Sequence, residues 1–265
     1  MKDLWTIYKV DAFTGTLFKG NPACVIEVQH WPAKELMLNI AAENAVAETA
    51  FFKRNGKRYE LRWFTPEIEM DLCGHATLAT AHIVNGLNKG GERRICFDTA
   101  SGELKVEVLG PDTYSMLLPC RPVEEAILPD VISQALSIQP QEVFKARDFV
   151  LYYSSQEEIE NLKVDKNILD RINLDPGGVV VTAEGRESDF VSRYFTPQSS
   201  ILEDPVTGSS HCSLIPFWRE RLGKDRMKAY QLSERGGLLY CSYLVDKVRI
   251  RGQVVDYMKG LIQLQ

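Results

Sequence analysis

The feature that most constrains this chain is a short segment that occurs twice. Arg62–Pro66 (RWFTP) recurs as Arg193–Pro197 (RYFTP), 131 positions later in a chain of 265 residues. In both places an apolar stretch typical of a strand ends in Phe-Thr-Pro, and an acidic loop and an apolar helix follow. An offset near half the chain length indicates an internal duplication.

A second pair of segments follows the first. Asp71–Thr77 (DLCGHAT) and Glu203–Cys212 (EDPVTGSSHC) each place a glycine, Gly74 or Gly208, where we expect a helix to begin. The first turn of a helix presents unpaired N–H groups and the positive end of the helix dipole, which suit a small carboxylate. We therefore expect Gly74 and Gly208 to bind substrate, with the two helix ends facing each other across a cleft.

The duplication predicts two α+β domains, over residues 1–120 and 121–265, each of ordinary domain size. The last ten or so residues are expected to return to the first domain. Residues 76–84 are small or apolar almost all round, so they predict a helix that is buried on every side. A sheet should wrap around this helix.

Composition excludes several classes of protein. The chain is 45% hydrophobic and 25% charged, as in an average globular protein, and its net charge of −5 argues against nucleic acid as a partner. It contains no run of 18 apolar residues and no secretory leader, so we expect a cytoplasmic protein that does not bind membranes. Its six cysteines are scattered singly and should be reduced, without a structural zinc site.

Further elements follow from periodicity and turn residues. Residues 5–13 and 23–26 alternate like a strand hairpin, and the prolines of residues 119–129 suit a linker. A proline inside the second long helix, Pro216, should kink it or remove one hydrogen bond. The helices that we expect, besides the buried one, cover residues 33–44, 131–136, 156–162, 168–173 and 208–222.

Two polar residues stand out in apolar surroundings. Glu48 lies in the strand-like stretch 47–52, where an ionised carboxylate is costly to bury without a partner. It is either a general acid or base, or a strand residue that faces water. Asn21 precedes Pro22 and is held extended or in a turn, so its amide points into the cleft and binds substrate, or else it serves only the turn.

Three residues form a candidate proton-transfer set if the two halves face each other. A carboxylate at Asp204 can orient and stabilise an imidazole at His75, while Glu48 moves the substrate proton. The alternative role for Asp204 is that of a helix N-cap.

Two other chemistries were weighed against proton transfer by Glu48. A thiol-based racemase needs two facing cysteines, but Thr207 occupies the position that corresponds to Cys73, and Cys212 lies a turn further on. A metal site made of Cys73, His75, His211 and Cys212 lacks the usual ligand spacing. We therefore expect no metal.

Five motifs in one order resemble the PhzF-like (phenazine biosynthesis) isomerase family. The resemblance implies a diaminopimelate-epimerase-type fold of two pseudo-symmetric α+β domains. Each domain would be a curved mixed sheet around a central buried helix, with the site between the domains. The motifs are Gly20–Ala23, Ala47–Phe51, Arg62–Pro66, Leu72–Thr77 and Glu203–Cys212.

The resemblance also implies roles for single residues. Glu48 would be the acid/base, His75 and Asp204 its polar partners, and Ser209 would lie beside the substrate. The family's enzymes use no cofactor and are typically homodimers. Ala47 stands where a serine often precedes the glutamate.

The sequence thus favours a cofactor-independent isomerase that moves a proton within a small unsaturated or amino-bearing carboxylic acid. An amino-acid racemase or epimerase that uses Cys73, and a family member that binds ligands without turnover, are the alternatives.

Overall fold

The computed structural model describes residues 3–175 and 177–264 and divides into two units. The first unit comprises residues 1–117 and 251–265, and the second comprises residues 118–250. The outermost residues of both predicted domains, residues 1, 2 and 265, lie outside the described part. Within that part, no helix combines the length and the apolar character that crossing a membrane requires.

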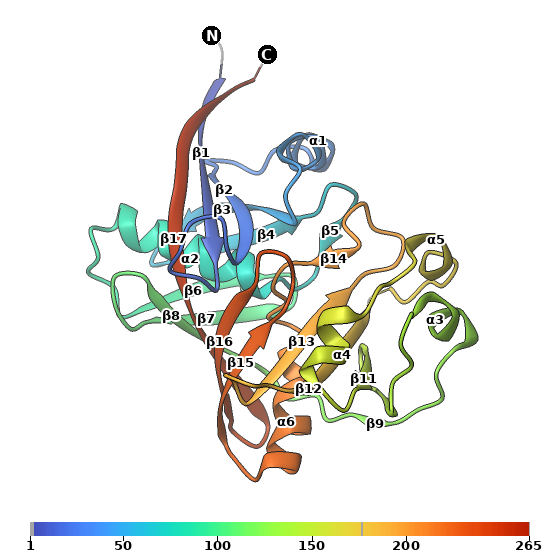
Figure 1. Ribbon diagram of the computed structural model, residues 1–265. Coiled ribbons are helices and arrows are strands. Elements are labelled where there is room, and N and C mark those ends of the chain that lie inside the picture. The colour runs from blue at the N-terminus through green and yellow to red at the C-terminus, as the bar shows by residue number, and fades with distance from the viewer. Residues whose placement is uncertain (1–2, 176, 265) are drawn as a thin grey trace. The chain divides into compact units, whose positions relative to one another are not determined.

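The first unit is a mixed sheet with two helices (Figure 1). Antiparallel pairs join β17 to β1, β1 to β2, β3 to β4, β6 to β7 and β7 to β8, whereas β2 pairs with β3, and β4 with β6, in parallel. The elements are β1 (Asp3–Ala12), β2 (Asn21–Glu27), α1 (Lys34–Asn44), β3 (Glu48–Asn55), β4 (Arg58–Phe64), β5 (Glu69–Met70), α2 (Gly74–Leu87), β6 (Arg94–Thr99), β7 (Gly102–Val108), β8 (Thr113–Pro119) and β17 (Lys247–Leu264).

Helix α2 is the centre of the first unit. Every residue from Gly74 to Asn85 is buried, and strands β1, β2, β3, β6 and β7 all contact the helix. Small side chains allow strands to approach closely from several directions. The two buried threonines, Thr77 and Thr80, donate their hydroxyls to carbonyls one turn earlier, which satisfies their polar groups. The predicted all-round burial is confirmed.

The second unit is also a mixed sheet with helices (Figure 1). Strand β11 pairs with β12 in parallel, β12 with β13 antiparallel, β13 with β15 in parallel, and β15 with β16 antiparallel. Its elements are β9 (Glu124–Glu125), α3 (Asp130–Ala135), β10 (Glu142–Lys145), β11 (Phe149–Tyr152), α4 (Gln156–Asn161), α5 (Lys166–Leu169), β12 (Val179–Glu184), β13 (Phe190–Phe195), β14 (Glu203–Asp204), α6 (His211–Leu222), β15 (Arg226–Gln231) and β16 (Gly237–Tyr243).

The order of strand pairing in the second unit repeats that of the first. The succession parallel, antiparallel, parallel, antiparallel runs through β2, β3, β4, β6 and β7 and again through β11, β12, β13, β15 and β16. In both units the strand that ends in Phe-Thr-Pro is followed by a two-residue strand that pairs back onto it, and then by a long helix. The two repeated segments of the sequence therefore occupy matching places in the two chain halves.

Helix α6 corrects one expectation and explains another. It begins at His211 rather than at Gly208, because residues 208–210 form a turn whose carbonyls accept hydrogen bonds from three residues on. Pro216 inside the helix has no N–H to offer the carbonyl of Cys212. The backbone N–H of Arg121 donates to that carbonyl instead, at 2.9 Å, so the helix loses a bond without leaving a buried group unpaired.

Other differences from the prediction are local. The short helix expected over residues 168–173 lies at Lys166–Leu169 instead, where the side chain of Asp165 caps its first N–H groups. The strands expected over residues 247–251 and 254–264 are one strand of 18 residues. Two longer strands were not predicted, β10 and β15, and neither has an uninterrupted apolar pattern.

Gly20 fixes the turn that leads into β2, and we expect Gly20→Ala to destabilise the protein strongly. Its φ is +67°, and an added Cβ would lie 2.2 Å from the carbonyl oxygen of Ala12. Gly56 has nearly the same φ, +62°, but open space around the added Cβ. Urea unfolding should therefore show a loss of about 1 kcal/mol for Gly56→Ala, from backbone strain alone, and a clearly larger loss for Gly20→Ala. Equal losses would contradict the close approach.

Candidate active site

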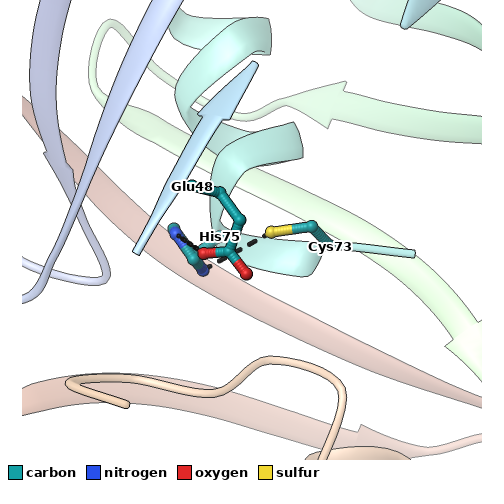
Figure 2. A group of neighbouring side chains, drawn as sticks. All are labelled: Glu48, Cys73 and His75. Atoms are coloured by element: carbon teal, nitrogen blue, oxygen red, sulfur yellow. Dashed lines mark hydrogen bonds and ion pairs between the residues drawn. The ribbon is translucent and has the colours of Figure 1, made fainter. Parts of the chain in front are cut away.

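Two predicted catalytic residues, Glu48 and His75, meet at one end of the first unit. Glu48 opens β3, and Ala23 of the neighbouring parallel strand β2 lies beside it in register. His75 is in the first turn of α2, directly after Gly74. Figure 2 shows the side chains of Glu48 and His75 facing each other, with Cys73 on the other side of the group. The strand ends and the helix start thus bring residues 27 positions apart into contact.

The contact between Glu48 and His75 is direct. Glu48 Oε2 lies 3.0 Å from His75 Nε2, and the side chains are 14% and 3% exposed. A partner within hydrogen-bonding distance lowers the cost of holding this carboxylate in apolar surroundings. The Glu48 side chain keeps some exposure, although its Oε2 is buried, while the imidazole is sealed, so Glu48 is the member of the pair that a ligand can reach.

Cys73 is the third member of the group. Its Sγ lies 3.6 Å from Nδ1 of His75, the ring nitrogen that faces away from Glu48. Burial, reinforced by the charge of Glu48, raises the pKa of the Cys73 thiol to about 11. Burial opposes a charge on His75, but Cys73 and Glu48 outweigh it and hold the pKa of the imidazole well above its ordinary value. The group is therefore a thiol, an imidazole that readily takes a proton, and a carboxylate.

Asn21 contacts this group rather than standing apart from it. It is the first residue of β2 and is completely buried, and its Nδ2 lies 3.1 Å from His75 Nδ1. The amide of Asn21 thus serves more than the turn, because its nitrogen lies against the imidazole. Its binding of substrate stays a prediction.

The group has the chemistry of a metal site without its geometry. Among the described residues, one set of acidic, His and Cys side chains has donor atoms within reach of a common ion, and these atoms of Glu48, Cys73 and His75 lie within 4.8 Å of one another. Glu48 and Cys73, however, face different nitrogens of the ring, whose lone pairs diverge. Side chains would have to move before a single ion could bind all three.

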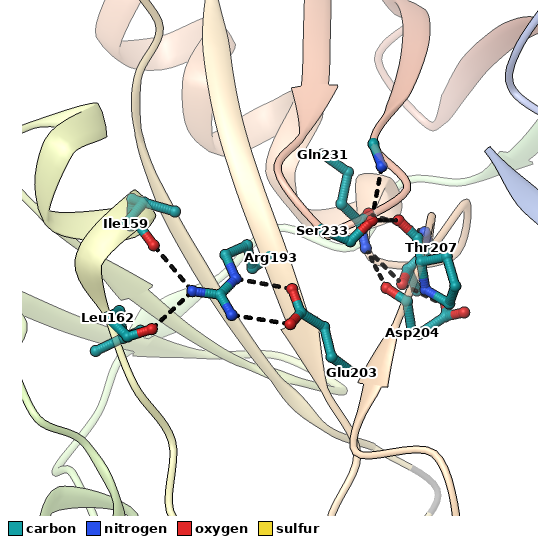
Figure 3. A network of polar contacts seen from close by, with 10 residues as sticks. Ile159, Leu162, Arg193, Glu203, Asp204, Thr207, Gln231 and Ser233 are labelled. Carbon is teal, nitrogen blue, oxygen red and sulfur yellow. Dashed lines mark hydrogen bonds and ion pairs between the residues drawn. The ribbon is translucent and has the colours of Figure 1, made fainter. Parts of the chain in front are cut away.

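Asp204, the third predicted catalytic residue, belongs to the second unit and lies in a polar network (Figure 3). Its carboxylate accepts the hydroxyl of Thr207, and its backbone carbonyl accepts from Nε2 of Gln231 at 2.8 Å. Gln231 also accepts from the backbone N–H of Thr207 at 2.8 Å. The loop that carries Asp204 is thus fastened to the end of β15. Within this loop Asp204 bonds a side chain rather than capping α6.

A neighbouring ion pair in Figure 3 holds the start of the same loop. Arg193 donates Nε and Nη2 to the two oxygens of Glu203, at 2.7 and 2.8 Å, and Nη1 to the carbonyls of Ile159 and Leu162. The first unit contains a corresponding ion pair, in which Nε of Arg62 donates to one oxygen of Glu69 at 2.7 Å. In each unit this arginine precedes Phe-Thr-Pro. The repeated segment therefore contains the arginine whose ion pair holds the loop before the long helix.

The other predicted residues have simpler surroundings. Gly74 is buried at the start of α2, and Gly208 is buried in the turn before α6. Ser209 is half-buried in that turn, and its carbonyl accepts the N–H of Cys212. The structure therefore brings Glu48, His75 and Asn21 together, while Asp204, Gly208 and Ser209 lie in the second unit.

Sequence reasoning missed two residues. Gln231 is completely buried and binds the loop of Asp204, but it belongs to β15, which was not predicted. A signal was present, because Met227, Ala229 and Gln231 alternate on the buried face of that strand. A glutamine in such a position needs buried partners. Cys73 was considered as a racemase thiol and as a metal ligand, and its hydrogen-bonding contact with His75 was not predicted.

A cavity of about 450 Å³ in the second unit does not include the predicted site residues. It opens between the start of α4, residues 186–188 and strands β13, β15 and β16. Arg186 and Lys228 line it together with Glu187, so charges of both signs are present. The chemistry described above lies elsewhere.

The fold is shared with a solved structure of low sequence identity. The solved structure of a hydroxyproline epimerase from Agrobacterium vitis matches 98% of this chain and 93% of its own length, with a TM-score of 0.66 and 11% identity. At that identity the likeness concerns the fold alone.

Closer relatives show the family. The sequence matches the family described as phenazine biosynthesis-like protein (PhzC-PhzF) over residues 10–260. A Pseudomonas aeruginosa protein named an uncharacterized isomerase is 42% identical over 259 residues, which are 98% of this chain and 99% of that protein. A PhzF-family structure from Enterococcus faecalis has a TM-score of 0.92 at 40% identity, covering 99% of this chain and all of its own. The chain belongs to the phenazine biosynthesis-like PhzC-PhzF family and is an isomerase, as predicted.

His211 should make the stability of the protein depend on acid. Burial lowers the pKa of His211 to about 4, although the carbonyl of Thr207 accepts its Nδ1–H at 2.9 Å. The unfolded chain takes up this proton near pH 6.5, so stability should be lost as the pH falls from 6.5 to 4. Between these values the parent should lose up to roughly 3 kcal/mol more than His211→Gln in urea unfolding. The exposed His30 provides the control, and His30→Gln should follow the parent.

Proposed function

We propose that the protein is an isomerase that moves a proton between carbon atoms of a small unsaturated or amino-bearing carboxylic acid, with Glu48 as the acid/base. The observation that carries this proposal is the pair formed by Glu48 and His75 at the start of a buried helix. The Glu48 side chain is partly exposed, and its carboxylate lies next to a group that stabilises its charge.

The electrostatics of the group act on His75, the neighbour of Glu48. His75 readily takes a proton, because Cys73 and Glu48 hold its pKa high against the effect of burial. The first turn of α2 adds unpaired N–H groups and the positive end of the helix dipole. Both features stabilise negative charge, on Glu48 and on the carboxylate of a substrate bound near Gly74.

The reaction needs one proton and no external electrons. Glu48 takes a proton from a substrate carbon, and the electron pair of the broken C–H bond moves into the adjacent unsaturated system. The protonated Glu48 exchanges its proton with water and then gives a proton to another carbon of that system. His75 stabilises the carboxylate before the first step and after the second.

The racemase reading is weaker. The hydroxyproline epimerase with the same fold was solved with trans-4-hydroxy-L-proline bound, which keeps amino-acid epimerisation in view. A racemase thiol must be a thiolate to act as a base. The pKa of Cys73 is raised to about 11, so at neutral pH this residue is a thiol beside His75 and a poor base.

The remaining expectations stay proposals. Asp204 and Ser209 of the second unit would contribute polar groups to the same reaction. The repeated order of strand pairing supports an origin of the two units by duplication. Activity without a cofactor, a cytoplasmic location and a homodimer are proposed from the family resemblance. Exposed apolar side chains on β1 and β17 support the dimer: Leu4, Tyr257 and Leu261 are 58%, 50% and 67% exposed.

Glu48→Gln should abolish proton transfer and leave binding largely intact. The protein is incubated in D2O with a panel of small unsaturated and amino-bearing carboxylic acids, and deuterium in each acid is measured by mass spectrometry. Glu48→Gln keeps the shape but cannot move a proton, so incorporation should fall by at least about 10²-fold. Affinity for the labelled acid, from thermal shift, should stay within about tenfold.

The matched control is Glu60→Gln. Glu60, on β4, is another partly buried glutamate of the same unit, but its carboxylate pairs with Lys53 and Trp31 rather than with His75. It should label substrate at the parental rate. A Glu48→Gln protein that labels as fast as the parent would remove Glu48 from the mechanism, and a panel without any labelling would favour a ligand-binding protein without turnover.

Cys73→Ser separates the isomerase from the racemase. Because the Cys73 thiol is buried and protonated, the variant should keep deuterium incorporation within about tenfold of the parent. Cys73 should also react slowly with iodoacetamide at pH 7, as followed by peptide mass spectrometry. Loss of labelling in Cys73→Ser, with Glu48→Gln unaffected, would establish the racemase instead.

A further inference from the structure

His75 is held from both sides. Nε2 lies 3.0 Å from Oε2 of Glu48, an ion-pair contact, and Nδ1 lies 3.1 Å from Nδ2 of Asn21, a hydrogen bond. Asn21 is 0% exposed and His75 is 3% exposed, so water does not replace either partner. An imidazole changes the chemistry of its Nδ1 when it takes or loses a proton, because a bare nitrogen accepts a hydrogen bond and a protonated one donates it. A partner that can do only one of these fits only one charge state.

The fold fixes Asn21 tightly. Gly20 before it has a positive φ and touches the backbone of Ala12, and Pro22 after it restricts its backbone to extended conformations. Asn21 opens β2, whose Ala23 lies beside Glu48 of the parallel strand β3. Both partners of His75 therefore come from the same ends of two adjacent strands. Their spacing is set by the sheet rather than by a loop.

An amide is the side chain that suits both charge states of the ring. Its N–H donates to a bare Nδ1, which is the arrangement that the structure shows. A half-turn of the amide exchanges its nitrogen for its oxygen, and the oxygen then accepts from a protonated Nδ1. The Cys73 thiol also lies near Nδ1, but at 3.6 Å it is a weak donor and a weak acceptor.

We propose that Asn21 is a positioning residue that keeps Nε2–H of His75 on Glu48 in both charge states of the ring, by offering its N–H to a bare Nδ1 and its carbonyl oxygen to a protonated one. The role of this device in catalysis rests on the proposed function, in which Glu48 moves the proton. Asn21 itself need not touch the substrate.

The consequence concerns the ring proton. Without a suitable partner at Nδ1, the proton of the neutral imidazole can lie on either nitrogen. When the proton lies on Nδ1, the carboxylate of Glu48 faces the lone pair of Nε2. Two electron-rich groups at 3.0 Å repel each other, so the carboxylate would lose its fixed position. With Asn21 present, the neutral ring keeps its proton on Nε2.

Nitrogen NMR on the free protein tests this without a substrate. The chain contains four histidines, so labelling with ¹⁵N-histidine gives few signals, and His30→Gln, His82→Gln and His211→Gln assign the other three. The nitrogen shifts report which ring nitrogen carries the proton. In the parent, Nε2 of His75 should stay protonated at every pH, and Nδ1 alone should titrate.

Two variants should move His75 in opposite directions. Asn21→Asp can only accept when ionised, so it should keep Nδ1 protonated to a pH at least about one unit higher than in the parent. Asn21→Leu offers no partner, so titration should shift down and the neutral ring should populate both nitrogens. Asn21→Ala replaces Asn21→Leu if the leucine variant does not fold. If Asn21 merely fills space, the titration of His75 Nδ1 should shift in the same direction in both variants or not shift at all.

The control is Asn85→Leu. Asn85 is another buried amide on α2, 6% exposed, but it donates to Tyr114 rather than to His75. Its loss should leave the His75 signals unchanged. Parental His75 titration in both Asn21 variants, or a neutral parental ring with its proton on Nδ1, overturns the proposal, whatever the outcome of the deuterium experiment.

Kinetics distinguish positioning from substrate binding. With the acid that Glu48 labels, Asn21→Leu should lower kcat at least about tenfold and leave KM within about threefold. A raised KM at unchanged kcat would mean that Asn21 binds substrate directly, and would overturn the positioning role.

Discussion

The burial of helix α2 is the constraint on which the rest of the first unit depends. A helix can be surrounded by strands only if its side chains are small, and from Gly74 to Ala81 this helix consists of Gly, Ala, Thr, Leu and one His. Its N–H groups are satisfied internally except in the first turn. The only part of the helix that can serve a ligand is therefore its start, which is where His75 lies. The burial of the helix therefore also determines where the site lies.

The arginine–glutamate ion pair that occurs in both units explains how the second unit can share this architecture and yet differ in chemistry. Arg62 and Glu69, like Arg193 and Glu203, tie the loop before the long helix back to the strand that ends in Phe-Thr-Pro. These pairs serve structure, and they are retained in both halves. The reactive group is not. The strand that corresponds to β3 by pairing order is β12, and it begins with Val179 where β3 begins with a glutamate.

What the sequence predicts well here is whatever repeats or whatever is locally odd. The duplicated Phe-Thr-Pro segments, the all-round apolar helix and Glu48 in an apolar strand were recognised because each contrasts with its immediate surroundings. Contacts between residues far apart in the sequence have no local pattern that predicts them. The amide of Asn21 meets His75 across 54 positions, and Gln231 reaches back to the backbone of Thr207 across 24. The start of α6 was misplaced for a related reason, since a turn and a first helical turn have the same local pattern.

The arrangement around His75 also resolves a conflict that burial creates. A sealed imidazole avoids charge, whereas the negative charge of a carboxylate such as Glu48 is stabilised by a neighbour that can become positive. Cys73 and Glu48 lie near enough to outweigh the burial of the ring, and the pKa of His75 is raised as a result. A group balanced between opposing terms of this kind changes its charge state easily, so its geometry must not depend on that state. Side chains with a single hydrogen-bonding sense cannot provide such independence, whereas an amide can. The type of residue at position 21 is therefore as much a part of the chemistry of Glu48 as the imidazole between them.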